Sequence, residues 1–303
     1  MPDRRPNLFL IGAHKSATTS LFEMLKAHPR IAMSSIKEPG YFSIPEHAAR
    51  GRHWYESLFR AVTDQPVIGE ASTTYSLCGI YPGTADRILE YSPNARFVYL
   101  VRNPWERLAS AWIQWRSEGC EIPDRFADAL REFPALLDSA RYWTQLNEYR
   151  RRVPADRVQV LFFEDFRRDS DAVVRQCLDF LGLEADHSAA TSRVHWNESS
   201  NKREDSPILR QLRRVPGYAS ARDWLAPARY RSTFKRWLTV PIRNRPHWDS
   251  ESLARVRDLI HAETLPLLGY CQRPLDFWIA PQEREGPHHP SLPERASSPS
   301  GLL

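Results

Sequence analysis

The sequence predicts an α/β fold in which helices flank a central parallel β-sheet, with a helical section on the C-terminal side. Short apolar runs alternate with amphipathic segments between residues 7 and 183, and this alternation is typical of strands joined by crossover helices. The chain has 303 residues, of which 42% are hydrophobic, so it can bury a substantial core. We therefore expect a single large α/β domain followed by a more variable section.

The first strand and helix lie near the start of the sequence. Residues 7–12 (NLFLIG) form a short apolar run that ends in glycine, which predicts a buried strand. Residues 18–29 place apolar side chains at helical spacing before a proline ends the helix. A second unit runs from a strand at 66–71 through a helix near 83–91 to a strand at 95–101. Strands connected in this way pair in parallel.

The later elements continue the alternation and then depart from it. Pro104 begins another helix, whose apolar residues share one face, and residues 157–166 predict a further strand followed by a helix over 171–183. Beyond about residue 195 the sequence becomes a polar loop and then basic segments interrupted by prolines. Residues 250–268 predict a final amphipathic helix.

Positive charge is concentrated in one segment. The formal net charge is +5, yet the stretch from Asn201 to Arg245 alone holds twelve Lys and Arg residues against three Asp and Glu residues. Such clustering favours an anionic ligand or surface, and a solvated helical face is the ordinary alternative. Within this segment, residues 221–238 predict an amphipathic helix that packs on the core, forms a lid over an acceptor pocket, or docks on an anionic membrane surface.

Several classes of protein are disfavoured by composition. No apolar run approaches the ~18–20 residues that span a bilayer, and the N-terminal residues show no cleavage-site pattern, so we expect a cytoplasmic protein. The four cysteines are widely spaced without a CxxC pair, which argues against a zinc site or a redox dithiol. Residues 281–303 predict a disordered tail, in which His288 and His289 are interpreted as incidental rather than metal-binding.

A lysine and a cluster of hydroxyl side chains follow the first strand. In a parallel α/β sheet, ligands bind beyond the carboxyl ends of strands, where helix N-termini present backbone amides. Residues 12–20 occupy such a place, so we expect their amides and hydroxyls to hold a phosphate while Lys15 supplies a charge. The pattern is not a Walker A loop, because no glycine directly precedes the lysine. A hydroxyl-capped helix start with a surface lysine is the structural alternative.

A second cation stands at the end of the strand at 95–101. Arg102 ends this apolar run, and the helix that begins at Pro104 carries Arg107 and Ser110 in its first two turns. A P-loop NTPase would need a carboxylate after such a strand to hold Mg²⁺. The two sites together predict a ligand with two separate anionic groups, bound without an obligatory metal.

Two stretches, together and in this order, resemble the nucleotide-binding motifs of the sulfotransferases that use 3′-phosphoadenosine 5′-phosphosulfate (PAPS), and a third motif adds to them. AHKSATTSL (13–21) resembles the family's 5′-phosphosulfate loop, and VRNPWERLASAW (101–112) resembles its 3′-phosphate motif. KEPGYF (37–42) resembles the Lys-Glu-x-x-[FY]-Phe element of the branch that includes heparan sulfate sulfotransferases and many bacterial enzymes. The branch that uses a histidine base on small molecules fits less well. GEASTTY (69–75) and VHWNESSNKRE (194–204) resemble the acceptor-side strand end and the loop that closes on the nucleotide.

The resemblance implies a sulfotransferase (EC 2.8.2.-) with a P-loop-like fold. Its domain would span residues 1–280, with a PAPS-binding core at about 7–205 and a helical acceptor or lid section at about 206–280. PAPS would be the co-substrate, 3′,5′-adenosine bisphosphate (PAP) the product, and the partner a hydroxyl-bearing, less favourably an amine-bearing, acceptor. A carbohydrate, a lipid and a secondary metabolite all remain open as acceptors, as does the oligomeric state. Nucleic acid is not expected as a partner, because no recognisable reading motif accompanies the basic segment.

The resemblance also implies roles for individual residues. Glu38 would be the base that deprotonates the acceptor, with Glu70 and His53 as alternatives and a helix-capping surface role as the structural interpretation. Lys15 would stabilise the leaving phosphate. Arg107 is as compatible with a structural ion pair as with a ligand contact. The cofactor-binding residues would be Lys15, Ser16, Ala17, Thr18, Thr19, Ser20, Arg102, Ser110, Lys202 and Arg203.

One residue of the first loop departs from the family pattern. Ala17 stands where the family usually has glycine, and its methyl group could crowd the phosphate or shift the loop. Two other functions therefore stay open beside the sulfotransferase: a nucleotide-dependent P-loop kinase-like enzyme, and a module that binds PAP or a polyanion without catalysis.

Overall fold

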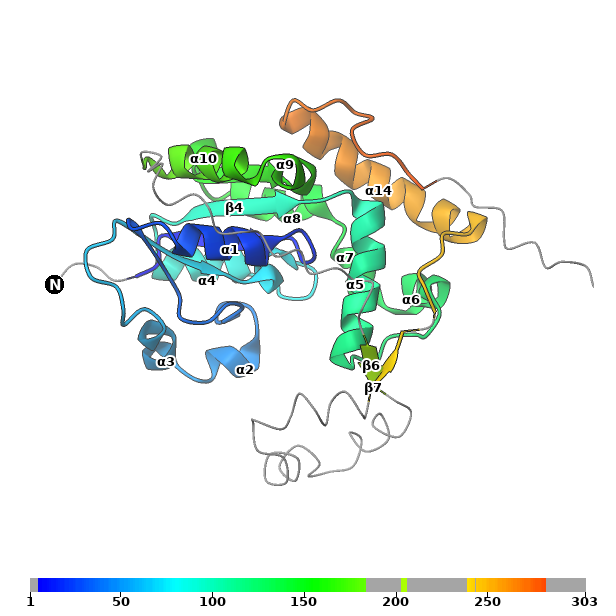
Figure 1. Cartoon of the computed structure of the whole chain (residues 1–303), viewed down its shortest axis with the longest axis horizontal. Helices are drawn as coiled ribbons and strands as arrows, with labels where there is room; N and C mark the ends of the chain where they lie inside the picture. Colours follow the sequence, from blue (N-terminus) through cyan, green and yellow to red (C-terminus); the bar gives the residue numbers. More distant parts are fainter. Residues whose placement is uncertain (1–4, 184–202, 206–238, 243, 282–303) are drawn as a thin grey trace, which may run out of the picture.

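The computed structural model describes residues 5–183, 203–205, 239–242 and 244–281. Its centre is a five-stranded sheet in which every strand pair is parallel, with the order β2-β3-β1-β4-β5 (Figure 1). The strands are β1 (Leu8–Gly12), β2 (Ile31–Met33), β3 (Val67–Ala71), β4 (Arg96–Val101) and β5 (Val158–Phe162). The predicted α/β class with a parallel sheet is confirmed.

The first strand occupies the middle of the sheet. Leu8 pairs with Gly69 of β3 on one side and with Arg96 of β4 on the other. All five residues of β1 are buried, which explains the uninterrupted apolar run in the sequence. Because the strands are parallel, β1, β3 and β4 all end at the same edge of the sheet, where their following loops meet.

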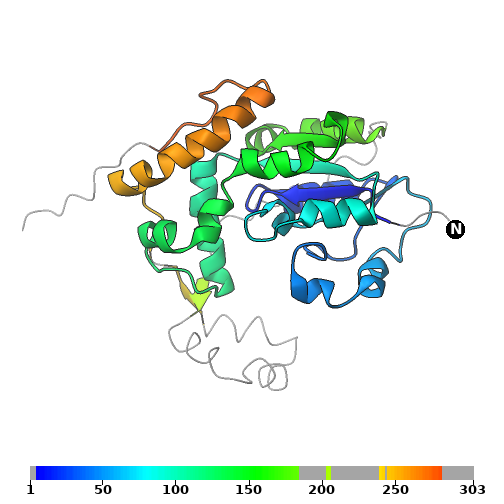
Figure 2. The same cartoon turned by 180° about the vertical axis from the view of Figure 1, so that it is seen from behind.

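Helices cover both faces of the sheet, as the views from the two sides show (Figures 1 and 2). Alternating residues of β1 belong to two cores: Leu8 and Leu10 pack with α1 (Thr18–Lys26) and α10 (Ser170–Leu181). Phe9 and Ile11 pack in the other core, which includes residues of α3 (Arg52–Ser57), α4 (Thr84–Tyr91) and α8 (Tyr142–Arg150). The sheet is thus buried on both sides.

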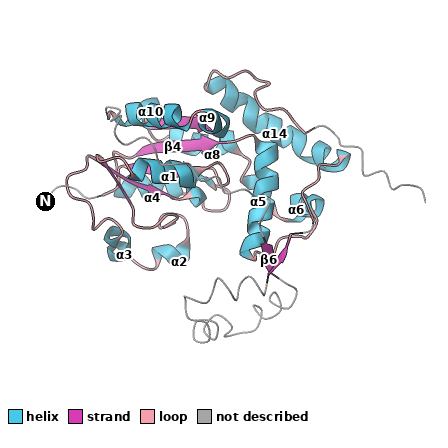
Figure 3. Cartoon of the chain, in the orientation of Figure 1, coloured by secondary structure: helices cyan, strands magenta, loops and turns pink. Residues whose placement is uncertain are grey.

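A third core lies beyond the end of the sheet. It forms around α5 (Pro104–Glu118) with α6 (Phe126–Glu132), α7 (Pro134–Asp138) and α14 (Ser250–Tyr270). Figure 3 shows the short antiparallel pair β6 (Arg203–Asp205) and β7 (Thr239–Pro241) at the far end of α5. The long helix therefore connects the sheet edge to the C-terminal section.

Some boundaries differ from those expected from sequence. The strand predicted over 157–166 ends at Phe162, and α9 (Phe163–Arg168) begins at once. The strand ends there at the carboxyl edge of the sheet, level with the end of β4. In α9, Glu164 accepts a hydrogen bond from the Asn103 amide at 2.8 Å. Sequence periodicity also missed β2 and the short helix α2 (Pro45–Ala48), which are too brief to show a period.

Several predictions fall outside the described residues. These are the amphipathic helix over 221–238, the nucleotide contact of Lys202, and residues 282–303 of the expected tail. Within the described ranges, no helix combines the length and apolar character needed to cross a membrane.

Candidate active site

The loop between β1 and α1 makes a close turn at the carboxyl edge of the sheet. Gly12 has φ 155°, and a Cβ atom there would lie 2.6 Å from the Ser76 hydroxyl oxygen, so glycine is required by the close approach. Ala17 precedes α1 in the left-handed conformation, with φ 65°, and provides no side-chain cap. Ala17 therefore leaves the amides in the first turn of α1 without a capping side chain from the N-cap residue, which suits an anion.

The two predicted anion sites lie against each other. The Arg102 guanidinium at the end of β4 donates to the Lys15 carbonyl at 3.4 Å. The Lys15 ammonium in turn donates to the Gln114 amide oxygen of α5 at 3.3 Å, and Gln114 lies one turn beyond Ser110 on that helix. The His14 ring stacks on Trp115 with the ring centroids 5.7 Å apart. The structure therefore brings the loop after β1 and one face of α5 together.

Several buried donors near this edge have no acceptor in the part of the chain that the structure describes. They are the Ser16 hydroxyl, the Arg102 Nε and all three nitrogens of Arg107. Arg107 is fully buried and lies over the Tyr142 ring at 5.6 Å, so the structural ion pair considered for it is not formed among these residues. A buried donor without an acceptor is costly unless a ligand supplies one. This donor set fits an anionic ligand.

Arg102 is positioned by its neighbours rather than left exposed. Another of its nitrogens pairs with Glu106 at 2.7 Å, and its guanidinium lies over the Phe163 ring at 4.4 Å. The Tyr142 hydroxyl donates to the Arg102 carbonyl at 2.8 Å. These contacts fix the backbone and the plane of the guanidinium where β4 ends.

Glu38 lies beside the carboxyl end of β3, the neighbour of β1. Its backbone amide donates to the Ala71 carbonyl at 2.8 Å, and its carboxylate accepts from the Thr73 amide at 2.7 Å. The Thr73 hydroxyl and the Lys37 ammonium also contact this carboxylate. About 40% of the Glu38 side chain remains exposed, so a carboxylate held at a fixed place still meets solvent. An oxygen of this kind can accept a proton from an entering hydroxyl group.

The two alternative bases are placed differently. Glu70 is fully buried at the end of β3 and accepts hydrogen bonds from Tyr55, Ser72 and Tyr75. Burial raises the pKa of Glu70 to about 7, although the hydrogen bonds oppose this shift. His53 is exposed on α3. The buried Glu70 cannot contact an acceptor from solvent as Glu38 can.

Arg203, which the resemblance predicts to contact the nucleotide, lies in β6 at the far end of α5 from the sheet. Its guanidinium donates to the Thr239 hydroxyl at 3.0 Å and to the Thr239 carbonyl, which joins β6 to β7. The next residue, Glu204, forms a buried ion pair with Arg116 of α5, with the Nε–Oε2 distance at 2.7 Å. Arg116 and Gln114 were missed because their partners are distant in sequence, although both lie on the helix that carries Ser110.

Comparisons with known proteins agree on one family. A family model described as "Sulfotransferase domain" matches residues 5–214. The chain is 30% identical over 192 residues to human heparan sulfate glucosamine 3-O-sulfotransferase 6, covering 60% of this chain and 54% of that protein. It is 40% identical over 116 residues to the membrane-associated sulfotransferase kil1 of Dictyostelium discoideum, covering 36% of this chain and 24% of that protein.

A solved structure gives a longer match. The crystal structure of a sulfotransferase from Alicyclobacillus acidocaldarius aligns with a TM-score of 0.55 at 27% identity, covering 85% of this chain and 96% of that chain. By contrast, the chain spans only about half of the human relative's length and about a quarter of the Dictyostelium one.

Proposed function

Because the chain belongs to the sulfotransferase domain family, we propose that it transfers a sulfuryl group from PAPS to a hydroxyl group of an acceptor. The observation that carries this proposal is the meeting of two sets of groups at one sheet edge. Buried cationic and hydroxyl donors follow β1 and β4, and a partly exposed carboxylate lies beside β3. The first set suits a nucleotide with separate anionic groups, and the second suits proton removal from an acceptor.

The groups that follow β1 and β4 form the side of the site that would bind PAPS, the sulfuryl donor; we call it the donor side. It would hold both ends of PAPS. The amides and hydroxyls of Ser16, Thr18 and Thr19 would bind the 5′-phosphosulfate, with the helix N-terminus favouring its charge. Arg102 and Ser110 would bind the 3′-phosphate, and Arg107 supplies three further buried donors beside them. PAPS supplies the activated sulfuryl group, and no residue of the described site has to be covalently modified.

The transfer step then divides between two side chains. Glu38 accepts the proton of the acceptor hydroxyl as that oxygen forms its bond to sulfur. The bond from sulfur to the bridging phosphate oxygen breaks, and Lys15 offsets the negative charge that develops on this oxygen. The sulfated acceptor and PAP are the products. The Lys15 contact with Gln114 places the ammonium on the α5 side of the loop, where the 3′-phosphate motif also lies.

The groups beside β3, which we call the acceptor side, favour membership of the family branch that uses a glutamate as base. The Lys37–Glu38 pair lies in the element that resembles this branch, and the human relative is a heparan sulfate enzyme. A carbohydrate hydroxyl is therefore our first proposal for the acceptor, ahead of a lipid or a secondary metabolite.

Calorimetric titration with PAP tests the nucleotide part of this proposal. PAP, adenosine 5′-monophosphate and ATP would each be titrated into the protein with and without Mg²⁺. We expect PAP to bind tightly in either condition and adenosine 5′-monophosphate, which lacks the 3′-phosphate, to bind more weakly. A preference for ATP that depends on Mg²⁺ would instead favour the kinase-like alternative. Tight binding of PAP with no transfer to any hydroxyl probe would favour a binding module.

A further inference from the structure

Three backbone and side-chain contacts attach the segment that carries Glu38 to the end of β3. The Glu38 amide donates to the Ala71 carbonyl, and the Thr73 amide donates to the Glu38 carboxylate. Between them, the Gly40 amide donates to the Ser72 hydroxyl oxygen at 2.9 Å. Glu38 and Gly40 both have positive φ, at 60° and 58°, so this backbone needs firm support to keep its shape.

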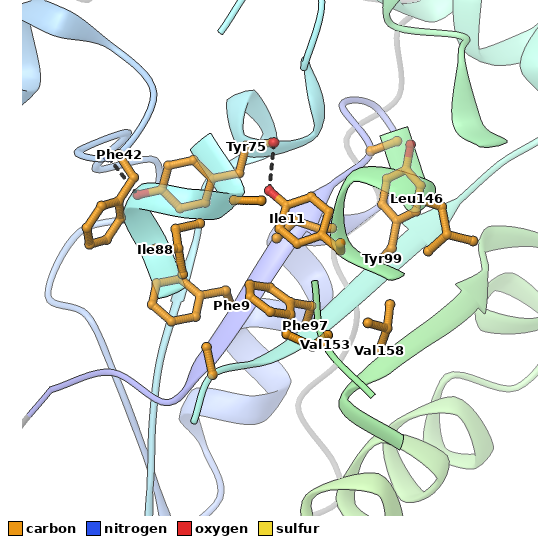
Figure 4. Packing of buried hydrophobic residues seen from close by; sticks show 14 of the residues in the cluster. Phe9, Ile11, Phe42, Tyr75, Ile88, Phe97, Tyr99, Leu146, Val153 and Val158 are labelled. Carbon is orange, nitrogen blue, oxygen red and sulfur yellow. Dashed lines mark hydrogen bonds between the residues drawn. The ribbon is translucent and has the colours of Figure 1, made fainter. Parts of the chain in front are cut away.

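A buried carboxylate lies behind these contacts. Glu70 accepts from the Ser72 hydroxyl at 3.0 Å and from the Tyr75 hydroxyl at 2.8 Å. The same two hydroxyl oxygens face the segment. Ser72 accepts from the Gly40 amide, and Tyr75 accepts from the Phe42 amide at 3.5 Å, as the dashed line beside the Phe42 label in Figure 4 shows. Through these two hydroxyl groups, Glu70 is linked to the backbone amides of the segment.

The direction of each hydrogen bond follows from the carboxylate. An ionised carboxylate only accepts, and a hydroxyl group has a single hydrogen to donate. While Ser72 and Tyr75 donate to Glu70, their remaining capacity toward the segment is as acceptors, which is what the Gly40 and Phe42 amides require. A neutral amide in place of Glu70 would present an N–H₂ group that cannot accept, and one hydroxyl would lose its fixed direction.

We infer that Glu70 is a positioning residue for Glu38, which it holds through the Ser72 and Tyr75 hydroxyls and the backbone of residues 38–42. This role rests on the proposed function of Glu38 as base. It explains why Glu70, which no acceptor can reach, lies at the same edge of the sheet as the candidate active site. It also separates Ser72 and Tyr75 from Tyr55, whose hydroxyl donates to Glu70 at 2.5 Å while its ring, not its hydroxyl, packs on Tyr41 and Phe42 of the segment.

Hydrogen exchange of full-length protein saturated with PAP tests this inference. Exchange would be followed by mass spectrometry in peptides covering residues 37–44, at pH 8, where a Glu70 with a pKa of about 7 is ionised. The groups facing it are Tyr55 of α3, Tyr75 of η1 (Thr73–Ser76), Ser72 and Glu38. Ser72→Ala and Glu70→Gln should each speed exchange in this segment roughly 3- to 10-fold, as the loss of one hydrogen bond implies.

Tyr55→Phe is the matched control, because it removes a hydrogen bond of equal standing from Glu70 and keeps the ring that packs on Phe42. It should lower the melting temperature while exchange in residues 37–44 stays within about twofold of the wild type. If Tyr55→Phe and Ser72→Ala speed exchange equally, or if neither Ser72→Ala nor Glu70→Gln does, the positioning role is wrong. Ser72→Ala keeps the test valid should Glu70→Gln fail to fold.

Transfer kinetics supply the second measurement and distinguish the two proposals. PAP release would be measured with three hydroxyl probes: a heparan sulfate oligosaccharide, a long-chain alcohol and a phenol. Ser72→Ala should lower kcat while PAP affinity stays unchanged, a split that general destabilisation would not produce. Absence of transfer in the wild type with all three probes would count against the proposed function alone, because the exchange result would still decide the role of Glu70.

Discussion

The two sides of the candidate site satisfy their polar groups in opposite ways. On the side of β1 and α5, the Ser16 hydroxyl and the Arg107 guanidinium are buried without an acceptor among the described residues. On the side of β3, both oxygens of Glu38 and both oxygens of Glu70 accept hydrogen bonds. The difference suggests that the first side is completed by an anionic ligand, whereas the second is already held in its working geometry by the protein.

This contrast has an energetic consequence. Each buried donor without an acceptor costs about 1–3 kcal/mol in the folded protein, and a charged group costs more. A ligand that supplies the acceptors recovers this free energy, so PAP should stabilise the fold in proportion to its affinity. The carboxylates beside β3 need no such ligand, because the hydrogen bonds of Tyr55, Tyr75 and Thr73 are present in the folded chain itself.

The largest loss of turnover is expected from a substitution on the acceptor side, at Glu38. Glu38→Gln keeps an oxygen for the Thr73 amide but removes the basic carboxylate, so turnover should fall by about 10²- to 10⁴-fold while PAP affinity is retained. Turnover with the most active hydroxyl probe and calorimetry with PAP would measure the two quantities. Glu46→Gln, on the exposed face of α2, is the matched control and should leave both unchanged. Parallel losses of turnover and PAP affinity would make Glu38 structural.

A smaller loss is expected from the donor side. Lys15→Met removes the ammonium that offsets charge on the leaving oxygen, and turnover should fall by about 10²- to 10³-fold. In the proposed mechanism this charge also binds the nucleotide, so PAP affinity should weaken as well, unlike in Glu38→Gln. Lys26→Met, at the exposed end of α1, provides the control for loss of a lysine. Full activity of Lys15→Met would place the charge-stabilising role on another residue.

The donor side could be predicted from sequence because its parts are contiguous. Residues 12–20 and the stretch from Arg102 to Ser110 each follow a recognisable apolar strand, and parallel pairing of β1 with β4 brings them together. The roles assigned to these residues, and to Glu38, stay predictions that the proposed experiments test. The strand order itself was not read from the sequence, since pairing of β1 with both β3 and β4 depends on tertiary packing.

The acceptor side was less predictable, since it depends on contacts between distant residues. From the sequence, Glu70 was interpreted as an alternative base. Only the structure shows that it is buried and accepts hydrogen bonds from Tyr55 and Tyr75. Distant pairs also went unpredicted around α5 on the donor side: the Lys15–Gln114 contact and the Arg116–Glu204 ion pair join residues 99 and 88 positions apart. For Arg107, the motif left open a structural ion pair or a ligand contact, and the guanidinium has no acceptor among the described residues.

The smallest effect concerns the residue of the phosphate loop that departs from the family pattern. Ala17 adopts φ 65° and ψ 22°, a left-handed conformation in which its Cβ atom is strained and glycine is not. Ala17→Gly should therefore raise the free energy of unfolding by about 0.5–1 kcal/mol, a net gain after the greater chain entropy of glycine is deducted. The measurement is denaturant unfolding of the ligand-free protein.

Ala27→Gly tests whether this gain comes from the backbone conformation. Ala27 ends the same helix α1 with φ −73°, where alanine is unstrained, so glycine there should lower the free energy of unfolding by up to about 1 kcal/mol. We expect the change in the free energy of unfolding to have opposite signs for the two substitutions. The PAP affinity of Ala17→Gly should equal or exceed the wild-type value. If Ala17→Gly destabilises as Ala27→Gly does, the loop is not strained at Ala17. The conformation of the loop after β1 would then suit alanine at position 17, and having alanine there instead of glycine would have no thermodynamic cost.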